Sequence, residues 1–381
     1  MNYDISIPFS IPDITDEDKQ AVLKALDSRW LTGGPKAKEF EELFANYIGA
    51  KYAISVNSCT AALHLSLKTI DIKPGDEVIV PVLTFAATAN CALFCGAKPV
   101  FVDVDNKTFN MSIEDLQRKI TDKTKAIIPV HYGGQSCDMK AVMEIAKDNN
   151  LYVVEDCAHS AGSMFNGLKT GSFGIGCFSF YPTKNMTTLE GGMITTNDEV
   201  IAKKCKLARS HYMTKDAFDR EKLSWYYDIT GLGYNYRLND VQSALGISQL
   251  KRLDSMNEGK RKNAQYLTSK LSKIPGIIPP YEATNCYHIY HLYVIRIIKS
   301  FFRLSRDELF RKLSLKGIGL SVHYTPLHFL SFYKNIFKYK KGDFPVAEEL
   351  YREILSLPMY HQLTKEQMDF IVEQISESVN Q

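Results

Sequence analysis

Residues 125–157, KAIIPVHYGGQSCDMKAVMEIAKDNNLYVVEDC, contain one complete strand–helix–strand unit. Residues 125–132 and 151–157 are rich in Ile and Val, and each run predicts a strand. Between them, MKAVMEIAKDNN carries apolar residues at helical spacing and predicts a helix. Two strands joined by a helix run parallel in one sheet, so this unit predicts an α/β fold.

The same strand–helix order repeats on the amino-terminal side of this unit. Residues 52–57, 76–82 and 99–104 predict strands, and apolar helical segments separate them. Their nearly continuous Val and Ile runs are typical of strands buried on both faces. We therefore expect a large, mixed but mostly parallel sheet with helices on both faces.

The carboxyl-terminal part of the chain has a different pattern, which predicts a second, smaller domain. A long helical stretch covers residues 240–271. Farther on, residues 318–324 predict a strand and residues 346–356 predict the first of two closing helices. We expect a large α/β domain over residues 1–250 and a small α+β domain over residues 251–381.

The bulk composition excludes several classes of protein. The net charge of the 381 residues is +3 and no basic tract is present, which argues against nucleic acid as a partner. No apolar run approaches the roughly 20 residues of a membrane span, and the amino terminus has no signal pattern. The 8 cysteines form no CxxC pair and no zinc-type cluster with histidine. We expect a cytoplasmic protein without a metal ion or membrane contact.

Three strand ends carry residues that suit a ligand, because open α/β sheets bind ligands beyond the carboxyl ends of their strands. The first is Ser58-Cys59-Thr60, at the start of a predicted helix. Free backbone N–H groups and the positive end of the helix dipole bind phosphate there. A plain helix cap is the alternative, and the common nucleotide-binding glycine loops are absent.

The second strand end is VVEDCAHS, residues 153–160. An acid such as Asp156 at the end of a buried strand is costly unless it meets a cation or strong donors. It can therefore hold a cationic ligand nitrogen, with His159 contacting the same ligand. The alternatives are a capping aspartate and a structural histidine.

The third strand end is FSFYPTKNMTTLEGGMITTND, residues 178–198, where Lys184 lies between two β-like runs. A solvated hairpin lysine is the alternative. Together, a phosphate site, a carboxylate for a ring nitrogen and a lysine amine are what pyridoxal phosphate requires. Ser179 lies within the first of these runs, and Phe85 can cover one face of the ring. Core packing is the alternative for Phe85.

At this point the chain resembles the sugar-nucleotide aminotransferases of the DegT/StrS type, which are fold-type I pyridoxal-phosphate enzymes with an aspartate aminotransferase-like fold. The resemblance runs almost from end to end of the chain. The motifs that carry it are LTGGPKAKEFE (31–41), NSCTAALHL (57–65), PVLTFAATAN (81–90), VVEDCAHSAGS (153–163), FSFYPTKNMTTLEGG (178–192), GYNYRLNDVQSALGISQL (233–250) and VHYTPLH (322–328).

The resemblance assigns roles to individual residues. Lys184 matches the lysine that forms a Schiff base with the cofactor, and Asp156 matches the partner of the ring nitrogen. Asn235 matches an asparagine that reaches the phosphate of the neighbouring subunit, which implies a homodimer with shared active sites. The other implied cofactor-binding residues are Ser58, Cys59, Thr60, Phe85, His159 and Ser179.

The resemblance also implies a reaction. Glutamate donates its amino group, the cofactor passes through pyridoxamine 5'-phosphate, and the acceptor is the 4-keto carbon of a nucleotide-linked sugar. The chain is most similar to enzymes that act on UDP-4-keto-6-deoxy-N-acetylhexosamines in pseudaminic acid biosynthesis. We expect Thr32, Arg237 and His323 to contact the sugar nucleotide.

Three alternatives to this reaction stay open. The first is amination of a GDP-linked 4-keto sugar to give perosamine. The second is a fold-type I enzyme that acts on a free amino acid, and the third is a catalytically silent protein that only senses the cofactor. A histidine in place of the lysine marks a dehydrating variant of the family, and this chain keeps Lys184.

Overall fold

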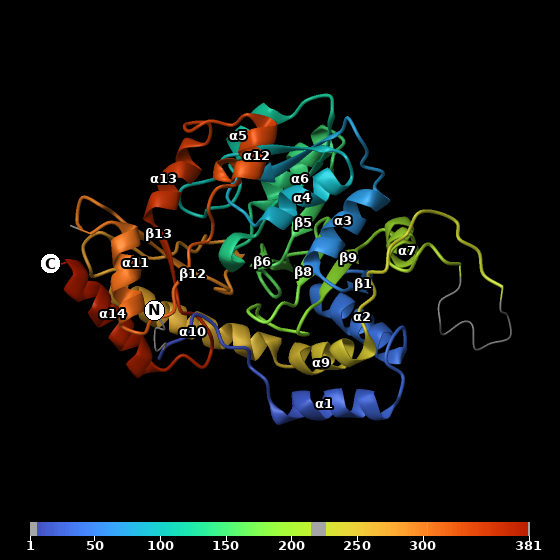
Figure 1. Ribbon diagram of the computed structural model, residues 1–381, viewed down its shortest axis with the longest axis horizontal. Coiled ribbons are helices and arrows are strands. Elements are labelled where there is room, and N and C mark those ends of the chain that lie inside the picture. Colours follow the sequence, from blue (N-terminus) through green and yellow to red (C-terminus); the bar gives the residue numbers. More distant parts are fainter. Residues whose placement is uncertain (1–5, 215–225, 303, 380–381) are drawn as a thin grey trace.

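The computed structural model describes residues 6–214, 226–302 and 304–379, and a seven-stranded sheet lies at its centre (Figure 1). The strand order is β1-β9-β8-β5-β4-β2-β3, and β9 alone runs antiparallel to both of its neighbours. This confirms the predicted mixed, mostly parallel sheet. Its strands are β1 (Tyr52–Val56), β2 (Glu77–Pro81), β3 (Lys98–Val102), β4 (Thr124–Ile127), β5 (Tyr152–Asp156), β8 (Ile175–Ser179) and β9 (Gly192–Thr196).

Helices pack on both faces of this sheet, because side chains along each strand alternate between the faces. In β2, Val78 and Val80 join one apolar core cluster and Ile79 joins another. One face is covered by α3 (Cys59–Thr69), α4 (Ala86–Phe94) and α7 (Glu199–Ala208). The other is covered by α2 (Pro35–Ile48), α5 (Ile113–Lys119), α6 (Met139–Asp148) and α9 (Asp240–Leu250).

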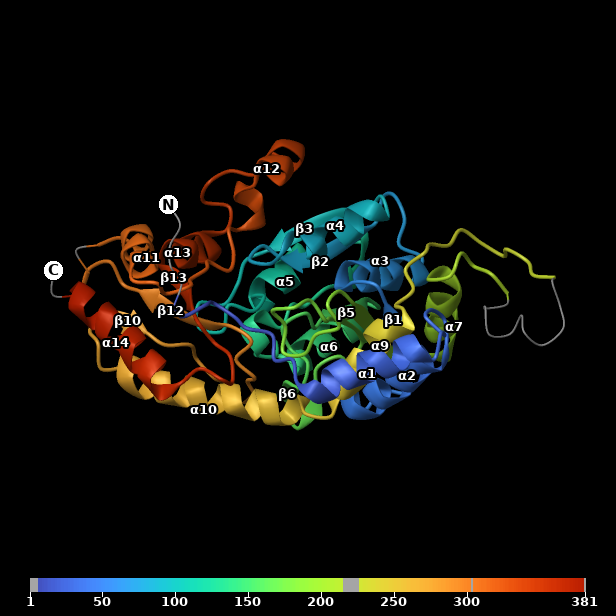
Figure 2. The ribbon, with the colours of Figure 1, turned by 60° about the horizontal axis from the view of Figure 1, so that its bottom comes forward.

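A second core lies around a three-stranded antiparallel sheet of β10 (Ile277–Ile278), β12 (Tyr293–Ile297) and β13 (Ile354–Leu357). Helices α10 (Leu253–Leu271), α11 (Arg306–Leu315) and α14 (Lys365–Val379) pack against it. Helix α1 (Asp16–Asp27) lies along α9 (Figure 2). The remaining elements are η1 (Tyr132–Gly134), β6 (Met164–Phe165), β7 (Leu168–Lys169), β11 (Cys286–Tyr287), η2 (Leu327–Phe329), α12 (Ser331–Phe337) and α13 (Pro345–Glu353).

Three expectations about the carboxyl-terminal part were wrong in detail. The helical stretch 240–271 is two helices, because the chain turns between α9 and α10. Residues 318–324 make only isolated bridges, while residues 354–357 form β13 and not the end of a helix. The fully buried run ILSL pairs with β12, so tertiary packing overrides the local helical pattern there.

The division between residues 250 and 251 stays a prediction. Helix α10 contributes Met256 to a core cluster of the large sheet and Leu267 to the core of the small sheet. No helix of the described chain is long and apolar enough to cross a lipid bilayer.

Glu155 fixes the carboxyl end of β5. Its carboxylate accepts backbone N–H groups of Gly171 at 2.8 Å, Phe173 at 3.0 Å and Gly174 at 2.9 Å. The Cys137 N–H donates to Nδ1 of His131, so the His131 proton lies on Nε2, which donates to Glu155 at 3.1 Å. Although Glu155, His131 and Cys157 are close enough to resemble metal ligands, protein donors already satisfy this carboxylate.

Replacing Glu155 by glutamine should lower the free energy of unfolding by about 2–4 kcal/mol, because the amide nitrogen would face backbone donors in a buried site. Urea titration followed by circular dichroism measures the change. The matched control Glu114→Gln lies exposed on α5 and should change the free energy by less than about 0.5 kcal/mol. Equal effects of the two substitutions would contradict the inference that the hydrogen bonds of Glu155 stabilise this end of β5.

Candidate active site

The ends of β5 and β8 and the start of α3 meet at one edge of the large sheet. Gly192 pairs with Ser179 on one side and with Val56, at the end of β1, on the other. A Cβ atom at position 192 would lie 2.5 Å from the carbonyl carbon of Ser58 and 2.7 Å from the amide nitrogen of Cys59. Glycine at this position therefore lets β9 lie directly against the start of α3.

The start of α3 combines a plain cap with free donors. Ser58 is the N-cap residue, and its hydroxyl accepts the Ala61 N–H at 3.1 Å. The Cys59 and Thr60 amides lie in the first turn, where helices have no internal acceptor for the N–H groups. The Thr60 hydroxyl has no hydrogen-bond partner in the described part of the chain. These donors fit a phosphate, and the Ser58 hydroxyl acts as the cap.

Asp156 is a buried carboxylate that the protein compensates only in part. Thr88 Oγ1 donates to it at 2.8 Å and the Ala158 N–H donates at 3.1 Å. Burial nevertheless raises the pKa of Asp156, and these donors and the Lys184 charge oppose the shift incompletely. A cationic ring nitrogen would supply the missing compensation, so the residue fits its predicted role.

Lys184 lies in the loop between β8 and β9, which is tied down along its length. The Lys184 N–H donates to the Tyr181 carbonyl at 2.9 Å, and the Thr187 hydroxyl donates to the Phe180 carbonyl at 3.0 Å. Burial lowers the pKa of Lys184 to about 8, while the charges of Cys59 and Asp156 act in the opposite direction. A lysine with this pKa is partly unprotonated near neutral pH and can act as a nucleophile.

His159 is buried and held as a neutral ring in one tautomer. The Gly133 N–H donates to Nδ1 at 3.3 Å, so the ring proton lies on Nε2, which donates to the Tyr324 hydroxyl at 2.9 Å. Burial lowers the pKa of His159 well below its ordinary value, and the Lys184 charge lowers it further. The centroids of the Tyr324 and Phe85 rings lie 6.1 Å apart.

Phe85 and Asn235 lie exposed at the surface. Phe85 is the N-cap of α4, and its side chain is 62% exposed. Asn235 is exposed on a segment whose backbone bridges to Ser210, and the neighbouring Tyr236 carbonyl accepts the Asn57 N–H at 2.9 Å. Their predicted contacts with the cofactor and with a second subunit stay predictions.

The three predicted substrate residues do not lie together. Thr32 and Arg237 line one cavity of about 780 Å³. The same cavity is lined by the basic side chains Lys38, Lys51, Lys206, Arg209 and His211, and also by two acids, Glu42 and Glu41, the latter paired with Arg209. His323 instead bonds Ser356 Oγ through Nδ1 at 2.8 Å, and burial and the Lys184 charge lower the pKa of His323 to about 4. The structure therefore places His323 close to Lys184 and not with Thr32 and Arg237.

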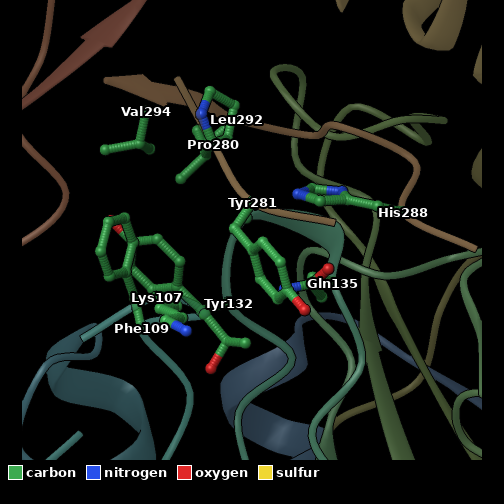
Figure 3. Close-up of a pocket in the computed structure, with 11 residues that line it drawn as sticks. Lys107, Phe109, Tyr132, Gln135, Pro280, Tyr281, His288, Leu292 and Val294 are labelled. Carbon is green, nitrogen blue, oxygen red and sulfur yellow. The ribbon is translucent and has the colours of Figure 1, made fainter. Parts of the chain in front are cut away.

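A smaller cavity of about 20 Å³, room for about one water molecule, is lined in part by Gly133, whose N–H bonds His159. In Figure 3, Phe109 and Tyr132 face Pro280 and Leu292 across it. None of the predicted site residues lines this cavity.

Sequence reasoning missed two residues of the site, Thr88 and Tyr324. Both lie inside motifs that carry the resemblance, TFAATAN and VHYTPLH. The position of Thr88 on α4, one turn after Phe85, was the available signal for Thr88. Nothing in the local sequence around Tyr324 points to His159, because the two residues are 165 positions apart.

Fold and site together define a fold-type I enzyme that uses pyridoxal phosphate. Residues 12–376 match the DegT/DnrJ/EryC1/StrS aminotransferase family, so the chain belongs to this family and is a pyridoxal-phosphate-dependent aminotransferase. Among curated relatives, the spore coat polysaccharide biosynthesis protein SpsC of Bacillus subtilis is 42% identical over 98% of this chain and 97% of its own length. The GDP-perosamine synthase of Caulobacter vibrioides is 37% identical over 96% of each chain.

Solved structures of similar chains confirm the predicted fold. The putative sugar aminotransferase Spr1654 from Streptococcus pneumoniae, in its PMP form, superposes with a TM-score of 0.93 at 33% identity and covers 98% of this chain and 99% of its own. Helicobacter pylori PseC, an aminotransferase of pseudaminic acid biosynthesis, gives a TM-score of 0.91 at 32% identity, with coverage of 98% and 99%.

The rate at which the apo-enzyme captures pyridoxal phosphate should rise about tenfold per pH unit up to pH ~8 and then level off, because only the neutral Lys184 amine attacks. Stopped-flow absorbance at several pH values measures the rate. Lys184→Ala should show no saturable capture. A midpoint near the ordinary lysine pKa of 10.5 would contradict the lowered pKa of Lys184.

Proposed function

We propose that this enzyme transfers the amino group of glutamate to the 4-keto carbon of a nucleotide-linked 4-keto-6-deoxy sugar, and that the natural acceptor is UDP-4-keto-6-deoxy-N-acetylhexosamine. The observation that carries the proposal is that Lys184 and Asp156 lie within range of each other's charge, at the sheet edge beside the start of α3. It is the arrangement required to hold pyridoxal phosphate and to move a proton beside it.

The chain offers a group for each part of the cofactor. The amides of Cys59 and Thr60, with the Thr60 and Ser179 hydroxyls, would hold the phosphate. Asp156 would hold the ring nitrogen, and Phe85 would cover the ring. When bound, the cofactor supplies an electron-withdrawing ring that stabilises negative charge on the substrate carbon.

Lys184 would act at the reacting carbon, and His159 would help to form the uncharged surroundings of the site. As a free amine, Lys184 would accept a proton from the donor carbon on Nζ, and in the second half of the reaction it would give a proton to the acceptor carbon. Its pKa of about 8 suits both directions near neutral pH. The neutral His159 ring donates a hydrogen bond to the Tyr324 hydroxyl, so this buried side of the site carries no charge.

A GDP-linked sugar is the second candidate acceptor. The GDP-perosamine synthase relative favours it at 37% identity, whereas the relation to PseC, at 32% identity, favours the UDP-linked sugar. The basic cavity that includes Thr32 and Arg237 suits the diphosphate of either nucleotide. A desulfurase acting on a free amino acid is less well supported, because burial raises the pKa of Cys59, the cysteine near Lys184, and a neutral thiol is a weak nucleophile.

A substrate panel tests the proposal. The purified enzyme should show the absorbance band of the lysine-bound cofactor, and Lys184→Ala should lose the band. Glutamate should shift the band, and mass analysis should find amination of the UDP-linked 4-keto sugar at least tenfold faster than of the GDP-linked sugar. Faster amination of the GDP-linked sugar would show that the GDP-linked sugar, and not the UDP-linked sugar, is the natural acceptor. A shift with cysteine but not with glutamate would contradict sugar amination.

We further propose a cytoplasmic homodimer with shared active sites. All 8 cysteines are free, as in a reducing compartment. The segments on either side of residues 215–225 run out from the body side by side (Figures 1 and 2), joined by bridges from Ser210 to Asn235 and from Met213 to Ile229. On this arm the side chain of Leu232 is 80% exposed, which favours burial against a second subunit.

Mixing two inactive variants tests the shared site. Lys184→Ala and Asn235→Ala should each have little activity, and their random mixture should recover about a quarter of wild-type activity. The reason is that half of the dimers would be mixed, each with one intact site. Sedimentation velocity of both variants is the control for dimer formation. No recovery in a mixture of stable dimers would show that Asn235 serves its own subunit.

A further inference from the structure

Lys260 is a buried lysine without an anionic partner, close to Lys184. It lies on α10 with only 5% of its surface exposed, and its Nζ lies 3.3 Å from Oδ1 of Asn185. No carboxylate of the described chain lies within ion-pair distance of it. A buried ammonium without a counter-ion destabilises a fold, so its position requires another explanation.

A row of hydrogen bonds holds Lys260 in one orientation. The Ala161 carbonyl can only accept, so the Asn257 amide nitrogen donates to it at 3.0 Å, and Oδ1 of Asn257 accepts from Nδ2 of Asn185 at 2.5 Å. Oδ1 of Asn185 is then an acceptor, to which the Lys260 ammonium donates. One backbone carbonyl thus sets the direction of every bond in the row.

The same oxygen of Asn185 links this row to His159. Nδ1 of His291 lies 3.1 Å from it and must donate, and the His291 ring lies 4.6 Å from the His159 ring. Asn185 directly follows Lys184 in the chain, so the row holds the backbone that carries the Lys184 amine. Gly162 leaves room for the row, because a Cβ atom there would lie 2.5 Å from Nδ2 of Asn257.

We propose that Lys260 is a positioning residue for Lys184. The hydrogen bond from Lys260 to Asn185 holds the loop that carries Lys184, and the positive charge of Lys260 favours the unprotonated Lys184 amine. This inference rests on the proposed role of Lys184 as the cofactor-binding lysine. No sequence motif pointed to Lys260, which lies 76 positions away on the first helix of the second core.

The electrostatics around both amines agree with this role. Burial lowers the pKa of Lys260 to about 7, and the Lys184 charge lowers it further. Cys59 and Asp156 face Lys184 with charges that raise its pKa. The histidines that interact with either lysine all have lowered pKa values and contribute little charge above pH 7, namely His159, His291, His323 and His361, the last with Asp13 and Arg252 beside it. Because the interaction between two charges is reciprocal, the Lys260 ammonium in turn disfavours the protonated Lys184 amine, and it does so up to about pH 7, where Lys260 still holds its proton.

The test is the pH midpoint of the absorbance band of the lysine-bound cofactor in the holoenzyme. Lys260→Met should raise the midpoint by about half a pH unit, because the loss of a nearby positive charge favours protonation and Lys260 carries that charge only in part above pH 7. Lys260→Arg carries its charge at every pH used and should therefore not raise the midpoint. Lys262→Met is the matched control on the exposed side of α10 and should not shift the midpoint.

A second readout separates the charge from mere packing. The pKa of Lys260 is lower in the folded than in the unfolded state, so wild-type stability rises with pH between about 7 and 10.5. The stability excess of Lys260→Met over wild type should therefore be greatest below pH 7 and decline toward pH 10.5. Should Lys260→Met not accumulate as folded protein, Lys260→Gln carries both comparisons.

An unchanged midpoint in folded Lys260→Met would overturn this inference. If Lys184→Ala also loses the band, the proposed function stands and only the role of Lys260 is wrong. If Lys184→Ala keeps the band, the proposed function itself is wrong, whatever the result at position 260.

Discussion

The pleat of β5 is the constraint on which the site depends. Successive side chains of a strand point to opposite faces, so the neighbouring carboxylates Glu155 and Asp156 separate. Glu155 accepts three backbone N–H groups and clamps the turn before β8. Asp156 points toward Thr88 and interacts with the charge of Lys184. Glu155 holds the edge of the sheet, and Asp156 keeps the unbalanced carboxylate that we propose binds the cofactor.

The site also contains buried charges that the protein alone does not balance. Asp156 lacks a full set of donors, and Lys184 and Lys260 are buried cations whose pKa values are lowered. Such an arrangement costs folding stability and is kept where a ligand or a reaction uses it. The fully satisfied Glu155 clamp next to it shows that the chain can pair a buried charge when the fold alone requires it.

Much of the fold could be predicted because the strands carry continuous apolar runs and the helices have clear caps. The prediction failed at residues 354–357, where a short apolar run joins a strand across the small sheet and local pattern does not distinguish strand from helix. Of the candidate site, Lys184, Asp156 and the start of α3 converge as the strand ends required. His323 lies with the Lys184 cluster and not with Thr32 and Arg237, since its ring bonds Ser356.

By itself, the sequence determined the α/β architecture and the family, and it pointed to Lys184 and Asp156 as the proposed reactive lysine and acid, because these depend on periodicity and on motifs within short segments. Only the tertiary structure decided which groups surround them. Thr88, Tyr324 and Lys260 reach the site from other helices and loops, at 68, 165 and 76 positions from Asp156, His159 and Lys184, respectively. Burial, which sets the charge state of each amine and carboxylate, exists only once those distant segments have packed together.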